Sequence, residues 1–491
     1  MIPTPAPRTG DDSHPGYRVP LARPRPGRAP KHQAPVKRGM SSGWSLLGSL
    51  LILVALALYA MGEWVFTKHT GPGLVAAPVL IAITFFALRR RIDEEKSFDL
   101  GGILLTSVGL HVLLAYPRFV TARDAVTYNQ EGARLAVSFR QFEFINVDVG
   151  AGAPVPGTGV LRYLAGLAHV LTDSNFFASF LIFAFLAFAG CWMFYRAFVT
   201  AVPDGDRRRY ALLLFLWPSL LFWPSSMGKD SWMVFTGGIA VLGAARLFTR
   251  VRGGYVLLAF GLGLGALVRP HVSLLLFAAL AIGFLIGRRD TRRIPGQFSL
   301  AGITKVIGIV ILLVAGSLLA PATAKFLKVD SLNTDGVTTA ITDTQAQTSG
   351  GNSSFHPANP NSPIGYPIAV VTVLFRPLPG EVGGLSALAS SLEGLALITI
   401  VATSWRRLWT ALRRLRSSPF ITMSAAYIAM FCYAFSAIAN FGILARERVQ
   451  VLPILFILLA LPASRRVTDE QGRTTTETPT EPATVGAGER R

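Results

Sequence analysis

Cysteine is scarce in this sequence of 491 residues, and charged side chains make up only 15% of it. The two cysteines, Cys191 and Cys432, lie inside apolar runs, which argues against a disulfide framework and a thiolate metal site. So little charge, with 51% hydrophobic residues and a mean hydropathy of +0.46, argues against a purely soluble enzyme. Short alternating strands are missing as well, so the apolar residues indicate membrane helices and not a transmembrane β-barrel.

Acidic residues are also few: 27 Asp and Glu stand against 47 Lys and Arg, which gives a net charge of +20. The basic residues lie in short runs between apolar blocks and in the N-terminal tail. This distribution indicates membrane topology, with membrane lipids as partners, and it does not favour nucleic-acid binding.

The apolar blocks predict an all-α, polytopic integral membrane protein with about twelve transmembrane helices, because about 20 helical residues cross a hydrocarbon layer of about 30 Å. The expected spans are 45 to 66, 71 to 89, 100 to 117, 176 to 200, 210 to 226, 230 to 249, 255 to 268, 272 to 287, 302 to 320, 386 to 404, 419 to 439 and 449 to 463. They form one transmembrane domain over 44 to 463.

Both ends of the chain are expected to be disordered cytoplasmic tails. Residues 1 to 43 are rich in Pro, Arg and Gly, residues 464 to 491 are polar, and neither segment has an apolar run to bury. With the twelve spans in place, the arginine-rich loops fall on the same side as both tails. The positive-inside rule therefore predicts a multi-pass plasma-membrane protein with cytoplasmic termini.

Two further apolar stretches, 158 to 172 and 366 to 380, do not fit this count, because either one as a span would place the later arginine-rich loops outside. We expect both to be interfacial or re-entrant helices. They belong to two long outer loops, about 118 to 175 and 321 to 385, which are the extramembrane segments large enough to shape a site.

Polar residues gather on the predicted outer side, next to the ends of apolar blocks. Cations there are not explained by topology, so we expect an anionic ligand such as a lipid phosphate or pyrophosphate. The candidate substrate-binding and catalytic residues are Asp124, Tyr128, Lys229, Asp230, Arg269, His271, Arg376, Glu381, Arg446 and Arg448.

Simpler structural interpretations exist for several of these residues. Asp230 is also expected as an N-cap of the next helix, and Arg269-Pro270-His271 as a helix end stopped by proline. Arg446 and Arg448 flank Glu447 and are also compatible with an exposed ion pair. Asp124 in a loop is by default a solvated carboxylate. The histidines show no metal-site spacing, so we predict no metal site from the sequence.

The segments Arg123-Asp124-Ala125-Val126-Thr127-Tyr128 and Trp223-Pro224-Ser225-Ser226-Met227-Gly228-Lys229-Asp230 carry a family likeness, as do Leu374-Phe375-Arg376-Pro377 and Leu444-Ala445-Arg446-Glu447-Arg448. The layout resembles the GT-C superfamily of membrane glycosyltransferases, and the motifs resemble actinobacterial polysaccharide-cluster membrane proteins. In that superfamily an acidic residue opens the first outer loop. Here the acidic loop follows the third span, and no second carboxylate adjoins Asp124, which puts a metal-dependent variant in doubt.

The resemblance implies a glycosyltransferase that moves a sugar from a polyprenyl-phosphate donor to a cell-envelope glycan or lipid-linked acceptor at the outer face. Asp124 would be the general base. Lys229, Arg269, Arg376, Arg446 and Arg448 would hold the lipid phosphate, His271 would orient it, and Tyr128 would line the sugar site. No further cofactor is implied, and the need for a divalent metal stays open.

Two other functions remain open at this stage. A polysaccharide polymerase or ligase also handles lipid pyrophosphates with outer arginines, and it would depend on Arg376 and not on Asp124. A transporter or flippase for lipid-linked sugars usually shows internal repeats, which this chain lacks, and the clustering of cations at one face also argues against a path across the membrane.

Overall fold

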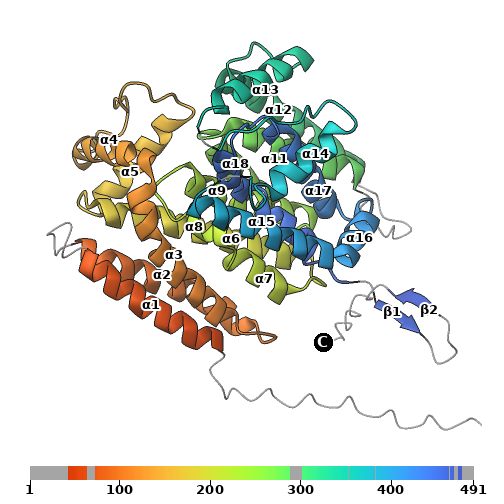
Figure 1. The fold of residues 1–491 in the computed structure, drawn as a ribbon, viewed down its shortest axis with the longest axis horizontal. Helices are drawn as coiled ribbons and strands as arrows, with labels where there is room; N and C mark the ends of the chain where they lie inside the picture. The colour runs from red at the N-terminus through yellow and green to blue at the C-terminus, as the bar shows by residue number, and fades with distance from the viewer. Residues whose placement is uncertain are drawn as a thin grey trace, which may run out of the picture. The chain divides into compact units, whose positions relative to one another are not determined.

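The computed structural model describes residues 43–62, 72–287, 301–351, 353–381, 383–463, 465–468 and 474–477. Up to residue 463 the described chain is built from helices (Figure 1). A two-stranded antiparallel sheet follows, formed by β1 (Arg465–Thr468) and β2 (Thr474–Glu477). This sheet falls within 464 to 491, where the sequence predicts a disordered tail, and residues 1 to 42 of the N-terminal tail lie outside the described residues.

The first half of the chain supplies nine helices to the described residues. They are α1 (Gly43–Gly62), α2 (Pro72–Glu94), α3 (Leu100–Thr121), α4 (Arg123–Arg140), α5 (Thr158–Leu171), α6 (Phe176–Ala201), α7 (Arg207–Phe215), α8 (Pro218–Phe222) and α9 (Lys229–Phe248). Several begin at a side-chain cap: Asp99 accepts from the Gly102 N–H at 2.8 Å, and Asn175 accepts from the Ala178 N–H at 2.9 Å. Such caps satisfy backbone donors that the first helical turn leaves free.

The second half supplies the remaining helices. They are α10 (Gly254–Ala266), α11 (Pro270–Ile286), α12 (Ala301–Leu327), α13 (Thr334–Thr348), α14 (Gly365–Phe375), α15 (Leu385–Thr403), α16 (Trp405–Arg414), α17 (Pro419–Phe435), α18 (Phe441–Glu447), the 3-10 turn η2 (Arg448–Gln450) and α19 (Leu452–Leu459). Proline occupies the first position of α11 and α17, where its missing N–H costs nothing.

Five of the described helices are long and apolar enough to cross a membrane: α1, α3, α6, α9 and α15. A sixth span results if α16 and α17, which bend by 114° at their junction, are counted together. These helices confirm the helical character of the chain and indicate a membrane protein. They do not confirm the predicted count of twelve spans.

Two of the expected spans differ most from the structure. The stretch 210 to 226 is broken at Trp217–Pro218 into α7 and α8, because proline cannot continue the hydrogen-bond ladder of α7. The stretch 449 to 463 contains η2 and the 8-residue α19, which at 1.5 Å per residue is about 12 Å long. Neither stretch forms one helix of membrane-spanning length.

The two apolar stretches left out of the predicted span count each form a short helix. α5, with 14 residues, lies in 158 to 172, and α14, with 11 residues, begins at Gly365 and covers the first part of 366 to 380. At 1.5 Å per residue both are shorter than a hydrocarbon layer of about 30 Å. α5 packs against α4, and together they cover one end of α3 (Figure 1).

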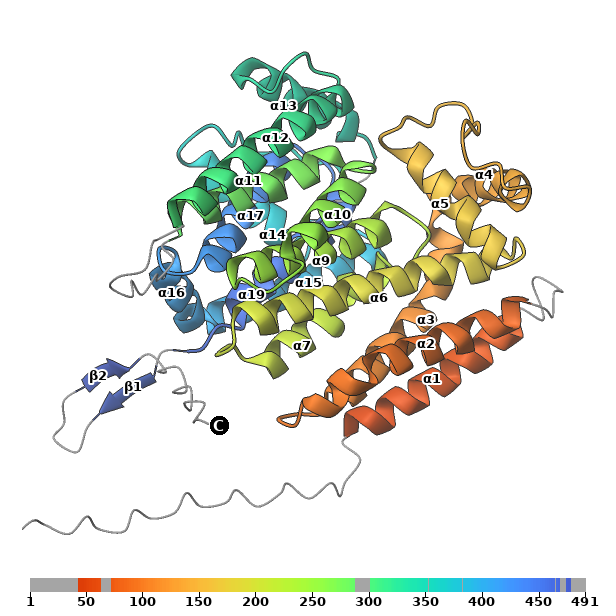
Figure 2. The same cartoon turned by 180° about the vertical axis from the view of Figure 1, so that it is seen from behind.

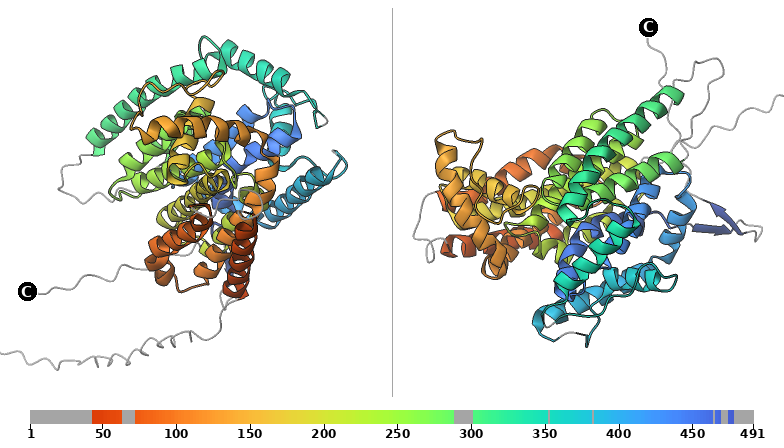
Figure 3. Two further views of the ribbon diagram at one scale, coloured as in Figure 1. Left: turned by 90° about the vertical axis from the view of Figure 1, so that its left-hand side faces the viewer. Right: turned by 90° about the horizontal axis from the view of Figure 1, so that it is seen from above.

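The best-packed part of the core lies between α6 and α9, which run side by side (Figure 2). Gly190 and Gly238 let the two backbones touch, since a Cβ atom on either glycine would collide with backbone atoms of the other helix. α10 packs on the other side of α9, while α1 packs along α3 (Figure 3). This packing fixes the start of α9, where the polar residues meet.

Candidate functional site

Charged side chains from five parts of the chain lie close together where α3 ends and α4, α9 and α11 begin. We call this set the pocket cluster. It contains four cations and three carboxylates: Arg118, Lys229, Arg269, Arg446, Asp124, Asp230 and Glu447. Five of the seven, Asp124, Lys229, Asp230, Arg269 and Arg446, are candidates that the sequence predicts.

Arg446 of α18 joins two carboxylates from distant helices. Its Nε donates to Asp230 Oδ2 at 2.6 Å, and its Nη1 lies 3.5 Å from Asp124 Oδ2. The Asp230 side chain is fully buried, whereas the Asp124 side chain is 62% exposed. The Asp230 carboxylate raises the pKa of Arg446 above its ordinary value. Asp124 is therefore the carboxylate of the cluster that a solvent-borne molecule can reach.

Arg269 and Glu447 form a buried bidentate pair. Arg269 Nη2 donates to Glu447 Oε1 at 2.7 Å, Arg269 Nη1 donates to Oε2, and Gln450 Nε2 adds a bond to Oε2 at 2.5 Å. Arg269 Nη2 also lies 3.8 Å from Asp230 Oδ1. A helix end is expected at Arg269-Pro270-His271, and α10 does end just before it, at Ala266, while Arg269 is the N-cap of the next helix, α11. The pair Arg269–Glu447 links α11 to α18.

Arg118, in the last turn of α3, is the part of the cluster that the sequence reasoning missed. The residue is 6% exposed, and its guanidinium lies 5.2 Å and 5.0 Å from the ring centroids of Phe222 and Trp223. Its hydrogen bonds to Thr121 and Ser226 are long, at 3.4 Å and 3.5 Å, and Nε is buried with no acceptor. No carboxylate of the described chain lies within 4.0 Å of Arg118, which is an unusual state for a buried cation.

A pocket of about 210 Å³ opens beside Arg118. Its lining also includes Asp124, Arg446, Arg123, Thr121, Trp223, Ser226, Met227 and Gly228. The pocket lining therefore combines an exposed carboxylate residue, three arginines and two hydroxyl residues, Thr121 and Ser226. Lys229 directly follows Gly228, which lines the pocket. It has no carboxylate within 4.0 Å in the described part of the chain, so it is a second unpaired cation near the pocket.

Tyr128 stands one helical turn after Asp124 in α4, and it is 4% exposed. Burial, and then the nearby Asp124 carboxylate, raise the pKa of Tyr128 to about 12. The phenol thus keeps its proton at physiological pH and remains a hydrogen-bond donor beside the cluster.

Asp230 is not the N-cap that the simpler interpretation expects. Gly228 occupies the N-cap position of α9, and the Asp230 carboxylate bonds Arg446 instead. The exposed ion pair expected around Glu447 is also wrong, because Glu447 is 8% exposed and pairs with Arg269 rather than with its neighbours in the chain.

The other predicted residues lie outside the pocket wall. His271 packs against the rings of Phe326 and Phe435, with centroid distances of 5.0 Å and 6.1 Å. Arg448 is 2% exposed and donates to the carbonyls of Val373 and Arg376.

Arg376 and Glu381 form their own pair, with Arg376 Nη2 2.6 Å from Glu381 Oε1. Burial alone would raise the pKa of Glu381, but the hydrogen bonds from Arg376 and the Leu378 N–H lower it below its usual value. The Arg376 guanidinium also lies 4.8 Å from the Phe441 ring centroid, at the start of α18. These residues support α18 and do not face the pocket.

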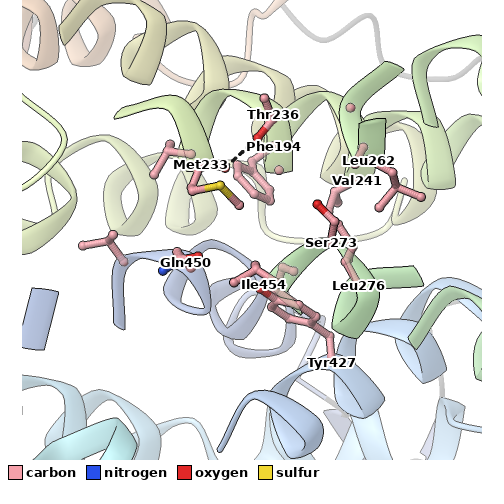
Figure 4. Close-up of a pocket in the computed structure, with 16 residues that line it drawn as sticks. Phe194, Met233, Thr236, Val241, Leu262, Ser273, Leu276, Tyr427, Gln450 and Ile454 are labelled. Carbon is pink, nitrogen blue, oxygen red and sulfur yellow. Dashed lines mark hydrogen bonds between the residues drawn. The ribbon is translucent and has the colours of Figure 1, made fainter. Parts of the chain in front are cut away.

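A second cavity lies inside the helix bundle, among Phe194, Met233, Ser273, Tyr427 and Gln450 (Figure 4). Its volume of about 20 Å³ is close to that of a single water molecule, so it does not suit a substrate. No group of three or more His, Cys, Asp or Glu residues that could hold a metal ion is found among the described residues.

Comparisons with protein families, with functionally characterised proteins and with solved structures find no match to this chain. The assignment of a function therefore depends on the residues of the pocket cluster themselves.

Arg118 and Glu447 carried usable signals in the sequence. Arg118 follows Pro117 at the end of an apolar span, on the side where cations are not explained by topology. Glu447 lies between two arginines in a short apolar segment. A charge in such a place is costly unless it is paired or bound, which makes it a candidate by default.

Proposed function

We propose that the chain is a membrane glycosyltransferase that moves a sugar from a polyprenyl-phosphate donor to a cell-envelope glycan or lipid-linked acceptor, at the extracytoplasmic face of the plasma membrane. The observation that carries the proposal is that one pocket is lined by both an exposed carboxylate and a buried guanidinium. Asp124 is a reachable carboxylate, and Arg118 is a buried guanidinium without a carboxylate, so the pocket suits a base-assisted reaction on an anionic substrate.

In this proposal Asp124 removes the proton from the acceptor hydroxyl as its oxygen attacks the anomeric carbon of the donor sugar. The bond from that carbon to the phosphate oxygen breaks, and the polyprenyl phosphate leaves with the electron pair. General-base catalysis needs the carboxylate within hydrogen-bond reach of the attacking oxygen, which the exposure of Asp124 permits. Arg446 Nη1, 3.5 Å from Asp124 Oδ2, holds this carboxylate at the pocket.

The leaving phosphate gains charge as the bond breaks, so fixed cations beside it lower the barrier. Arg118 and Lys229 have no carboxylate within 4.0 Å among the described residues, and they are the groups we assign to this role. Arg269 and Arg448, in contrast, are already bound to Glu447 and to backbone carbonyls. Arg446 is bound to Asp230, and Arg376 is bound to Glu381. We therefore reduce the predicted set of phosphate ligands to Lys229 and add Arg118.

The test compares a deletion strain that carries the wild-type chain, Asp124→Asn or Asp148→Asn. Asp148 is the matched control, because it is an exposed carboxylate of the same predicted outer loop, 3.6 Å from Arg134 and away from the pocket. Surface glycans and extractable lipid-linked sugars are analysed together. We expect Asp124→Asn to lower transfer by about 10²–10⁴-fold, so one sugar is missing from the glycan, while Asp148→Asn restores it.

Full rescue by Asp124→Asn would refute the role of Asp124 as base. Complete but unpolymerised repeat units in the deletion strain, cleared equally by wild type and Asp124→Asn, would instead identify a polysaccharide polymerase or ligase.

A further inference from the structure

Helix α16 shows a continuous exposed face that no other described element covers. Trp405, Trp409 and Leu412 are 61%, 49% and 58% exposed, and they follow one another at intervals of four and three residues. Arg406 and Arg413 are exposed beside them. Residues at this spacing share one side of a helix, so the face combines two indole rings, one leucine and two guanidinium groups.

The opposite face of α16 is held firmly by the bundle. Arg407 bonds Asp206 at 3.0 Å and the Leu461 carbonyl at 2.5 Å. Arg414 makes a bidentate pair with Asp204, at 3.1 Å and 2.6 Å. These bonds fix the rotation of the helix about its axis, so the exposed face is a built feature of the fold.

The two arginines on the exposed face have no acidic partner. Neither Arg406 nor Arg413 has a carboxylate within 4.0 Å among the described residues. Instead, the Arg406 guanidinium lies 5.7 Å from the Trp405 ring centroid, and that of Arg413 lies 5.5 Å from the Trp409 ring centroid. Each pair thus offers a flat apolar ring with a free cation on it.

The exposed face continues the lipid-facing surface of α15. That helix is long and apolar enough to cross a membrane, and its Leu388, Leu392 and Leu395 are 49%, 56% and 40% exposed. α16 begins two residues after α15 ends, at Ser404. The end of a membrane span is the headgroup level, where tryptophan and arginine are the side chains that bridge apolar and polar surroundings.

We propose that α16 is a binding site for the anionic headgroups of phospholipids. Trp405, Trp409 and Leu412 enter the boundary between headgroups and acyl chains, and Arg406 and Arg413 bind lipid phosphates. The two arginines are seven residues apart, or about 10 Å along the helix axis, which is enough to bind two separate phosphate groups. This site is distinct from the pocket cluster and does not depend on the proposed enzymatic activity.

The experiment uses the full chain in nanodiscs of phosphatidylcholine that contain a small, equal fraction of brominated phosphatidylglycerol or brominated phosphatidylcholine. Bromine quenches nearby tryptophan fluorescence. The quenching at α16 is the difference between the wild type and Trp405→Phe/Trp409→Phe, which lacks the two tryptophans of this helix. We expect the anionic brominated lipid to be enriched at α16 by about fivefold for each arginine, since one arginine near an anionic surface contributes about 1 kcal/mol.

Arg406→Gln/Arg413→Gln should bring the quenching by the two brominated lipids to the same level. The control is Arg134→Gln/Arg140→Gln, which removes the same charge from α4 and should leave the difference intact. Equal quenching in the wild type, or a preference that survives in Arg406→Gln/Arg413→Gln, would overturn the proposal. A preference that survives Trp405→Phe/Trp409→Phe would place the anionic lipid elsewhere and overturn it too.

Discussion

Arginine–carboxylate pairs gather in two regions of the molecule, which differ in how completely the charges are paired. The pocket cluster lies where α3 ends. A second set, which we call the loop cluster, lies around the loop between α6 and α7 and joins Arg207 to Glu95, Arg407 to Asp206 and Arg414 to Asp204. In the loop cluster each arginine has its own acid, and most of these side chains are partly exposed. In the pocket cluster Asp230 and the Arg269–Glu447 pair are buried, and two cations, Arg118 and Lys229, have no carboxylate within 4.0 Å among the described residues.

This difference separates a structural role from a functional one. The loop cluster joins loops that the sequence predicts on one side of the membrane, and its pairs balance one another. The pocket cluster holds an excess positive charge next to an open volume, which costs free energy unless a ligand supplies negative charge. The comparison leads to four predictions.

The largest effect is expected from Glu447→Gln. The change leaves Arg269 buried without its bidentate partner, and breaking a buried pair typically costs about 3–5 kcal/mol. We expect a marked drop in the thermal unfolding temperature of the purified protein in detergent. A shift no larger than that of Asp206→Asn would show that the two clusters do not differ in this way.

A smaller effect, with the opposite sign for stability, is expected from Arg118→Gln. Removing an unpaired buried charge should leave the unfolding temperature unchanged or higher in the absence of anions. Inorganic phosphate should stabilise the wild type, compared with chloride at equal ionic strength. A charged hydrogen bond contributes about 1.5–3 kcal/mol, so the variant should bind phosphate about tenfold to a hundredfold more weakly. An unchanged phosphate effect in Arg118→Gln would contradict the assignment.

Acid should weaken the α4–α5 region, next to the pocket cluster, through His169. Burial lowers the pKa of His169 to about 4, and its Nδ1 lies 2.9 Å from Ser179 Oγ. The unfolded chain binds a proton below about pH 6.5 and the folded chain only near pH 4. Stability is therefore complete above pH 6.5 and falls as the pH drops toward 4. We expect a loss of about 1–2 kcal/mol between pH 7.5 and pH 5, measured by denaturant unfolding. His169→Gln should reduce that dependence, and an equal acid response in wild type and variant would exclude His169 as a source of it.

The smallest effect is expected from Asp206→Asn in the loop cluster. Partly exposed ion pairs contribute about 0–1 kcal/mol and are screened by salt, so the unfolding temperature should change little. The small change that remains should shrink further in 0.5 M salt, because the Debye length is then on the order of a few ångströms and the ion pair is screened. A loss as large as that of Glu447→Gln would remove the distinction between the two clusters.

Much of the fold follows from hydrophobic runs in the sequence. The expected spans 100 to 117, 176 to 200 and 230 to 249 coincide with α3, α6 and α9, because long apolar runs leave a helix as the way to satisfy every backbone group in a membrane. The stretch 210 to 226 was interpreted wrongly, since its hydropathy hides the break at Pro218. Five predicted candidates do lie close together: Asp124, Lys229, Asp230, Arg269 and Arg446. Arg118 was not predicted, because it lies at the end of an apolar run.

The sequence by itself determined that this chain is helical, that it belongs in a membrane, and that cations collect at the ends of its apolar helices. These properties depend on composition and on neighbours along the chain. Only the tertiary structure decided which charges are paired. Asp230 and Arg446 are 216 residues apart, and Arg269 and Glu447 are 178 residues apart, so no local pattern connects them. The ion pairs of α18 with Arg269 and Asp230 neutralise Arg269 and Arg446. Arg118, which lines the pocket, and Lys229, next to Gly228 of the lining, have no carboxylate within 4.0 Å among the described residues. Ionic contacts are decided by proximity in space, which the order of residues along the chain does not reveal.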